Sequence, residues 1–159
     1  YKRQATLLTA MNTGHDGSFG SLHANTAQET VTRMINPPMS VPPIMLTGLD
    51  LIIIQARLHV NGKTARKITE VAEIAGMEGS KPRLNTIWKY NASTDQIEET
   101  GIPSNLREVI CRAAGVTPDV FEKHVNQRQQ IIEDLIARDI TDIQSVTTVI
   151  QNFYAQSHH

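Results

Sequence analysis

The sequence predicts an α/β protein with a mixed sheet, followed by a group of helices. Runs rich in β-branched residues with strand-like patterns fill residues 49–99, and helical segments precede them. From residue 103 onward, apolar residues recur only at helical spacing. We therefore expect an α/β core over residues 1–101 and a helical appendage over residues 102–156. Residues 157–159 are expected to be a tail or the remnant of an affinity tag.

The first part of the chain predicts two helices with a strand between them. Residues 3–12 place leucine and methionine at helical spacing, and Gly14 follows as a stop signal. Residues 19–24 alternate as a strand does. A capping box over residues 26–29 opens the second helix, and the Asn-Pro-Pro run at residues 36–38 ends it.

Strands are expected in the middle of the chain. Residues 49–55 are almost continuously apolar, as in a strand buried on both faces of a parallel or mixed sheet. Asn61-Gly62 predicts a hairpin turn into a strand over residues 67–76, and a further strand pair is expected at 84–90 and 96–99. Alternation divides the strand at 67–76 into two faces. One face holds Ile68, Glu70, Ala72 and Ile74, and the other holds Thr69, Val71, Glu73 and Ala75.

Three amphipathic helices are expected at the end of the chain. Ser104 caps the first, which Gly115 closes. Thr117-Pro118 begins the second, with proline at the first helical position, and Thr141 caps the third. Short turns join these helices, so they predict a bundle or an attached helical subdomain.

The composition limits the function. A net charge of −1 argues against a protein that coats nucleic acid or anionic lipid. Residues 1–90 carry ten Lys/Arg against six Asp/Glu, and residues 91–159 carry five against ten. This asymmetry indicates either a basic face that meets an anion or an acidic neighbour, or two solvated surfaces that merely differ. The single cysteine, Cys111, favours a reducing cytoplasmic setting, and the longest apolar stretch, 44–54, is too short to span a bilayer.

Residues 11–25 hold the densest cluster of small, polar and histidine residues. The glycines allow tight turns, and His15 and His23 can each donate a hydrogen bond to an anionic oxygen. The segment therefore either lines a site for a phosphate or another polar ligand, or is a glycine-rich turn with two histidines on its rim. No metal site is expected, because no Cys pair or His/Glu helix motif accompanies these histidines. No part of the chain matches a phosphate-binding loop that ends in Gly-Lys-Ser/Thr.

This segment also carries a family resemblance. Residues 11–25 read MNTGHDGSFGSLHAN, which resembles the His box of the type II/type IV secretion ATPases. Residues 46–58 (LTGLDLIIIQARL) and 65–78 (ARKITEVAEIAGME) look like the paired strands that follow the box in these motors. The proline-rich connector over residues 36–46 and the acidic helical tail look most like the archaeal branch.

The resemblance implies that residues 1–101 are the C-terminal half of a RecA-like P-loop ATPase core. It assigns Thr13, Gly14, His15 and His23 to the His box, with the two histidines in the catalytic role. In the family this box lies close to the nucleotide phosphates or helps to couple hydrolysis to movement between subunits. Arg57 and Arg66 flank the predicted hairpin turn; they are expected to bind phosphate or a neighbouring subunit, or to lie on a solvated surface.

For the parent protein, the resemblance implies an ATP- and Mg²⁺-dependent motor, a homo-hexamer that drives protein export or the assembly of a type IV pilus or archaellum. Its expected partners are neighbouring motor subunits and a membrane platform protein, with no nucleic acid. It is expected in the cytoplasm at the inner face of the membrane, with peripheral membrane association only. Because the chain lacks the phosphate-binding loop, we expect a fragment that is inactive alone and binds no cofactor tightly.

Two alternatives remain at this point. The chain can be a stand-alone or inactive paralogue that acts as a docking module for a true motor. It can also be an unrelated enzyme that uses His15 or His23 as a general base, which requires a histidine that titrates near neutral pH.

Overall fold

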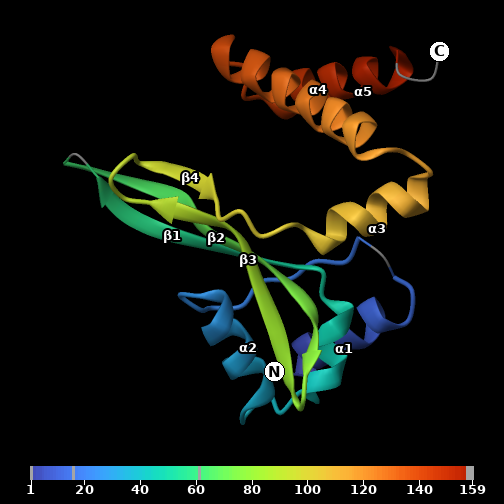
Figure 1. Ribbon diagram of the computed structural model, residues 1–159. Coiled ribbons are helices and arrows are strands. Elements are labelled where there is room, and N and C mark those ends of the chain that lie inside the picture. The colour runs from blue at the N-terminus through green and yellow to red at the C-terminus, as the bar shows by residue number, and fades with distance from the viewer. Residues whose placement is uncertain (1, 16, 61, 157–159) are drawn as a thin grey trace. The chain divides into compact units, whose positions relative to one another are not determined.

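A computed structural model describes residues 2–15, 17–60 and 62–156 (Figure 1). It confirms the α/β class and divides the chain into two compact units, residues 1–106 and 107–159. Tyr1, Asn61 of the predicted turn and the predicted tail at 157–159 lie outside the described residues. The elements, in chain order, are α1 (Lys2–Asn12), α2 (Ala27–Ile35), the 3-10 helix η1 (Pro43–Gly48), β1 (Leu51–Val60), β2 (Lys63–Glu78), β3 (Lys81–Asn91), β4 (Gln96–Glu99), α3 (Asn105–Ala114), α4 (Pro118–Ala137) and α5 (Ile143–Gln156).

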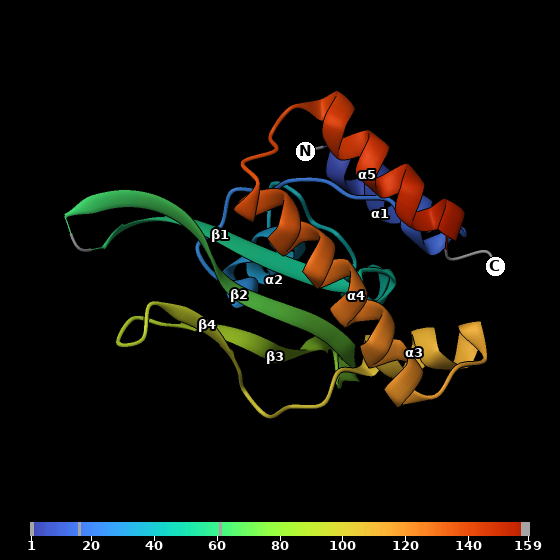
Figure 2. The same ribbon diagram turned by 90° about the horizontal axis from the view of Figure 1, so that it is seen from above.

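The sheet is antiparallel throughout the described residues, with the order β1-β2-β3-β4. The expected mixed sheet is therefore wrong for this part of the chain. So is the expected strand buried on both faces: Ile52 and Ile54 are each 5% exposed, but Ile53 between them is 57% exposed. The reason is that α2 packs against the face of β1 that holds Ile52 and Ile54, and Ile53 points to the opposite face. Figure 2 shows the same sheet from above.

A β-bulge corrects the predicted faces of β2. Ile54 lies opposite Glu70, whereas the next residue, Gln55, lies opposite Ile68. Residues opposite each other share a face, and neighbours along β1 point to opposite faces. Ile68 and Glu70 therefore lie on opposite faces, and the prediction that they share one is wrong because the bulge adds a residue between them.

The core of the first unit lies between the sheet and the short helices beside it. Thr26 caps α2 as predicted, since its hydroxyl accepts the Glu29 N–H at 3.0 Å. The backbone N–H of Asn25 and the side chain of Arg33 bind the Glu29 carboxylate and lower its pKa. Val31 of α2 is buried in the same cluster as Ile52 and Ile54 of β1. The buried cluster comprises Leu8, Ala27, Val31, Val41, Leu46, Ile52, Ile54 and Ala72.

Residues 19–24 do not form the predicted strand. They run as an irregular segment, and Phe19 is 91% exposed. A strand needs a neighbour for its backbone hydrogen bonds, and none of the described residues gives this segment one. The alternating pattern is therefore present in the sequence without the partner that would convert it into a strand.

The three predicted C-terminal helices form as α3, α4 and α5. The Thr117 hydroxyl accepts the Val120 N–H at the start of α4, where Pro118 occupies the first turn. Arg128 of α4 lies over the rings of Phe153 and Tyr154 of α5, at 5.5 and 5.9 Å from the two ring centroids. Among the described residues, no helix is both long and apolar enough to cross a bilayer.

Candidate functional site

The end of α1 sets the position of His15. Gly14 has φ +85°, and the His15 N–H donates to the Ala10 carbonyl at 3.2 Å, as in a Schellman-type helix end. The Thr13 hydroxyl lies 2.9 Å from the Thr9 carbonyl and 3.5 Å from Nδ1 of His15. The predicted site residues Thr13, Gly14 and His15 are therefore held together as the terminus of one helix.

A side chain outside the predicted site fixes this terminus to the rest of the unit. The Asn12 amide donates to the Leu8 carbonyl within α1 and to the Met45 carbonyl of η1, both at 2.8 Å. Gly48 at the end of η1 allows this approach, since a Cβ there would lie 2.5 to 2.7 Å from the Asn12 amide atoms. In the sequence, Asn12 is an amide in the last turn of a predicted helix, and Gly48 is a glycine in an apolar run. Neither signal indicates that the two residues meet.

His15 lines a hollow of about 280 Å³. Asp50, which directly precedes β1, lines the same hollow, as does Ser18. The Ser18 hydroxyl donates to the His15 carbonyl at 2.8 Å and closes the glycine-rich loop. An exposed imidazole, a carboxylate and backbone groups of a glycine-rich loop can together bind a polar ligand or orient a water molecule. Asp50 was not among the predicted site residues.

The structure does not bring the remaining predicted residues to this hollow. His23 is exposed and lines neither hollow described here. Arg57 and Arg66 lie directly opposite each other on β1 and β2, both exposed and also outside the two hollows. The six predicted residues thus fall in three places: the end of α1, the irregular segment, and the β1–β2 hairpin.

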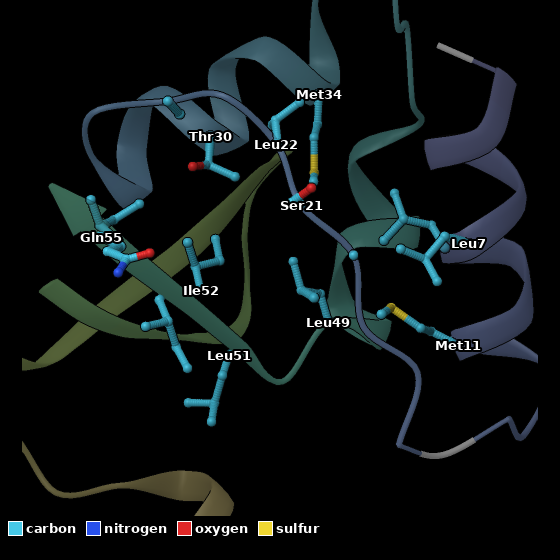
Figure 3. Close-up of a pocket in the computed structure, with 15 residues that line it drawn as sticks. Leu7, Met11, Ser21, Leu22, Thr30, Met34, Leu49, Leu51, Ile52 and Gln55 are labelled. Carbon is cyan, nitrogen blue, oxygen red and sulfur yellow. The ribbon is translucent and has the colours of Figure 1, made fainter. Parts of the chain in front are cut away.

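A second hollow, of about 340 Å³, lies beside the irregular segment (Figure 3). Residues 20–22 and Ala24 border it on one side, and residues 51–55 of the edge strand β1 border it on the other. Its lining is largely apolar, with Leu7, Leu22 and Met34 prominent in Figure 3. Within the described residues, neither the segment nor the outer edge of β1 has a strand partner.

Comparison with known proteins identifies the family. The sequence profile of the type II/IV secretion system protein family matches residues 3–152. The chain belongs to this family. The predicted resemblance to this family is thereby confirmed.

The similar curated proteins of Methanocaldococcus jannaschii are much longer than this family member. The uncharacterized protein MJ0781 is 36% identical over 136 residues, which is 84% of this chain and 19% of MJ0781. The uncharacterized protein MJ0900 is 28% identical over 94% of the chain and 28% of its own length. For the uncharacterized protein MJ1287 the values are 26%, 81% and 48%. The chain therefore spans between about a fifth and a half of these relatives.

Proposed function

We propose that this chain is the His-box part of a secretion ATPase, a motor that couples ATP hydrolysis to protein export or to the assembly of a pilus or archaellum. Membership of the type II/IV secretion system protein family supports the proposal. The observation that carries it is the hollow that His15 shares with Asp50, because it places an exposed imidazole of the His box and a carboxylate at one glycine-edged cavity.

In this proposal the end of α1 contacts the phosphates of ATP. The His15 ring donates a hydrogen bond to a phosphate oxygen, where charge develops during phosphoryl transfer. The Thr13 hydroxyl donates to the Thr9 carbonyl and lies 3.5 Å from Nδ1 of the same ring. Asp50 lines the same hollow. His23 lies on the following segment and acts from there, on the phosphates or in coupling hydrolysis to movement between subunits.

The chain's own residues fit one side of such a site and not the whole of it. The sequence has no loop ending in Gly-Lys-Ser/Thr to hold the phosphates. Among the described residues, no group of three or more His, Cys, Asp or Glu side chains is placed to hold a metal ion. We therefore propose that the phosphate-binding loop and the Mg²⁺ ligands lie in polypeptide outside residues 1–159, and that this chain alone is inactive.

The apolar hollow beside β1 supports the same conclusion. The outer edge of β1 and the segment over residues 20–24 border it, and both lack strand partners among the described residues. Open edges and apolar surface are costly for a complete domain. We propose that strands of the remaining ATPase core fill this hollow and complete a RecA-like sheet.

The parent motor is proposed to work as a homo-hexamer in the cytoplasm, at the inner face of the membrane. Neighbouring motor subunits and a membrane platform protein are its proposed partners, and its membrane association is peripheral. A docking module for another motor is the second candidate. Both candidates accommodate residues 1–159 without a phosphate-binding loop, and the upstream reading frame separates them.

ATP turnover separates these functions. We expect no turnover from the 159-residue chain and steady turnover from the protein translated with its upstream reading frame. His15→Ala in that longer protein should lower kcat by about 100-fold or more, since it removes one donor to the developing charge. His124→Ala, which removes an exposed histidine of α4, is the matched control and should leave kcat unchanged.

If the isolated chain turns over ATP and His23→Ala abolishes this turnover, the proposal that part of the ATP site lies outside residues 1–159 is refuted. An upstream frame without a phosphate-binding loop, together with a longer protein that shows no turnover, would favour the docking module.

A further inference from the structure

The hairpin formed by β1 and β2 extends beyond the part of the sheet that β3 covers. Backbone pairing between β2 and β3 begins at Glu70, so residues 55–60 and 63–68 form a two-stranded ribbon, visible at the far end of the sheet in Figure 1. The chain has no Asp or Glu between residues 51 and 69. The ribbon therefore carries cationic side chains and no carboxylate of its own.

Two arginines on this ribbon face each other. Arg57 and Arg66 are directly opposite in the antiparallel register, so their Cβ atoms lie about 5 Å apart and their side chains share one face. The next pair on the same face, closer to the turn, is His59 and Thr64. The Nδ1 atom of His59 and the Thr64 hydroxyl oxygen are 3.3 Å apart. This face thus presents two guanidinium groups with further polar groups beside them.

Neither arginine has an ion pair or a side-chain hydrogen bond among the described residues. The ribbon's other face provides the contrast. Lys67 lies 2.5 Å from the Asp95 carboxylate, and the Tyr90 hydroxyl donates to the same carboxylate at 2.7 Å. The hydrogen bonds from Lys67 and Tyr90 lower the pKa of Asp95. Among the described residues, Lys67 on one face therefore has a carboxylate partner, and the arginine pair on the other face has none.

We propose that Arg57 and Arg66 together bind a doubly charged phosphate group. Like charges directly opposite each other in a sheet are destabilising, and a dianion between them removes that repulsion. A phosphate monoester carries close to two negative charges at neutral pH, and the planar guanidinium matches its oxygens with paired N–H donors. A single carboxylate carries one negative charge and therefore balances the positive charge of only one of the two arginines.

This site is separate from the hollow at His15, since neither arginine lines it. The proposal therefore does not depend on ATP hydrolysis by a parent motor, and it can fail or succeed independently. The phosphate can belong to a soluble molecule or to a lipid headgroup, because both present the same group. Arg57 and Arg66 are both exposed, so the pair is accessible to either source.

Titration of the 159-residue chain tests the site. The Nε–H signals of Arg57 and Arg66 are followed by NMR while inorganic phosphate is added at constant ionic strength, with acetate as the singly charged comparison. We expect both signals to shift with phosphate and to move little with acetate. Arg57→Gln or Arg66→Gln should weaken phosphate binding by about tenfold or more, since each removes a charge-assisted pair of hydrogen bonds.

Lys63→Gln is the matched control: it removes one charge from the same ribbon, opposite Val60 on the other face, and should leave phosphate affinity unchanged. Vesicles of phosphatidylcholine with phosphatidic acid identify the source. Arginine-dependent binding to free phosphate alone indicates a soluble ligand, and binding to vesicles alone indicates a headgroup.

Thermal unfolding gives a second measurement. Without phosphate, each arginine variant should melt at a higher temperature than the unchanged chain, because the repulsion is gone, and added phosphate should raise its Tm less than it raises that of the unchanged chain. Equal affinity for phosphate in the chain and its arginine variants, or equal responses to phosphate and acetate, would overturn the proposal.

Discussion

Asn12 and Gly48 hold the end of α1, and with it His15, against η1. The Asn12 amide satisfies a carbonyl of η1 at Met45, and Gly48 leaves the space that this amide occupies. This exposed contact joins segments 33 residues apart, so its loss removes a bond between the end of α1 and η1. The position of the candidate site thus depends on a pair of residues that takes no part in its chemistry.

Gly48→Ala should destabilise the first unit by about 1–3 kcal/mol, because its Cβ would overlap the Asn12 amide. Asn12→Ala removes the overlapping atoms, so the double variant should cost less than the sum of the two single changes. Urea unfolding of all four proteins measures this coupling. Strictly additive costs would show that the two side chains do not meet in solution.

At the residue scale the sequence predicted His15 as a candidate site residue because the fifteen-residue pattern at 11–25 carries it, and the helix stop at Gly14 is equally local. It did not identify Asn12 or Asp50, since their roles arise from contacts across the fold: Asn12 reaches a carbonyl 33 residues away. A local sequence pattern indicates where a residue lies along a helix or strand, but it does not indicate which two elements are in contact.

Among the elements, strand β2 connects the sheet to two helices through two glutamates. Glu70 accepts the Ala27 N–H at the start of α2 at 2.8 Å and the Thr86 hydroxyl of β3 at 3.0 Å. Glu73, only 2% exposed, accepts the Ser104 hydroxyl and the Asn105 N–H at the start of α3. Each carboxylate lies at a helix N-terminus, where negative charge is favourable.

Glu73→Ala should destabilise the first unit by about 1–3 kcal/mol, since it removes a buried carboxylate that accepts two part-buried hydrogen bonds at the start of α3. Glu73→Gln keeps one acceptor oxygen and should cost less. Glu78→Ala, on the exposed end of the same strand, is the control and should have little effect. Chemical denaturation measures all three; equal stability of the Glu73 and Glu78 variants would contradict the proposed role of the carboxylate.

The sequence predicted the position of every strand in the sheet, because turn signals and β-branched runs are local. It did not predict the bulge that places Ile68 on the other face, since register depends on the neighbouring strand. It also predicted a strand over residues 19–24 that is absent here. That pattern requires a partner strand, and pairing partners are a property of the whole sheet rather than of the segment.

At the scale of the whole molecule, the unpaired segment and the open edge of β1 belong to one feature, the apolar hollow between them. In the isolated chain, backbone amides over residues 20–24 should exchange with solvent nearly unprotected, because no backbone hydrogen bond holds them among the described residues. In the longer protein of our proposal, strands from the rest of the core occupy the hollow. Exchange over residues 20–24 should then slow by on the order of 100-fold.

Hydrogen exchange read by mass spectrometry compares the two proteins directly. Amides where β2 pairs with β3, around Val71 and Glu73, already lie inside the sheet and should exchange at the same rate in both. Equal rates over residues 20–24 in the two proteins would mean that nothing pairs with this segment. The proposal that the chain is one part of a larger ATPase core would then lose its structural support, because the hollow would be a surface feature and not the seat of missing strands.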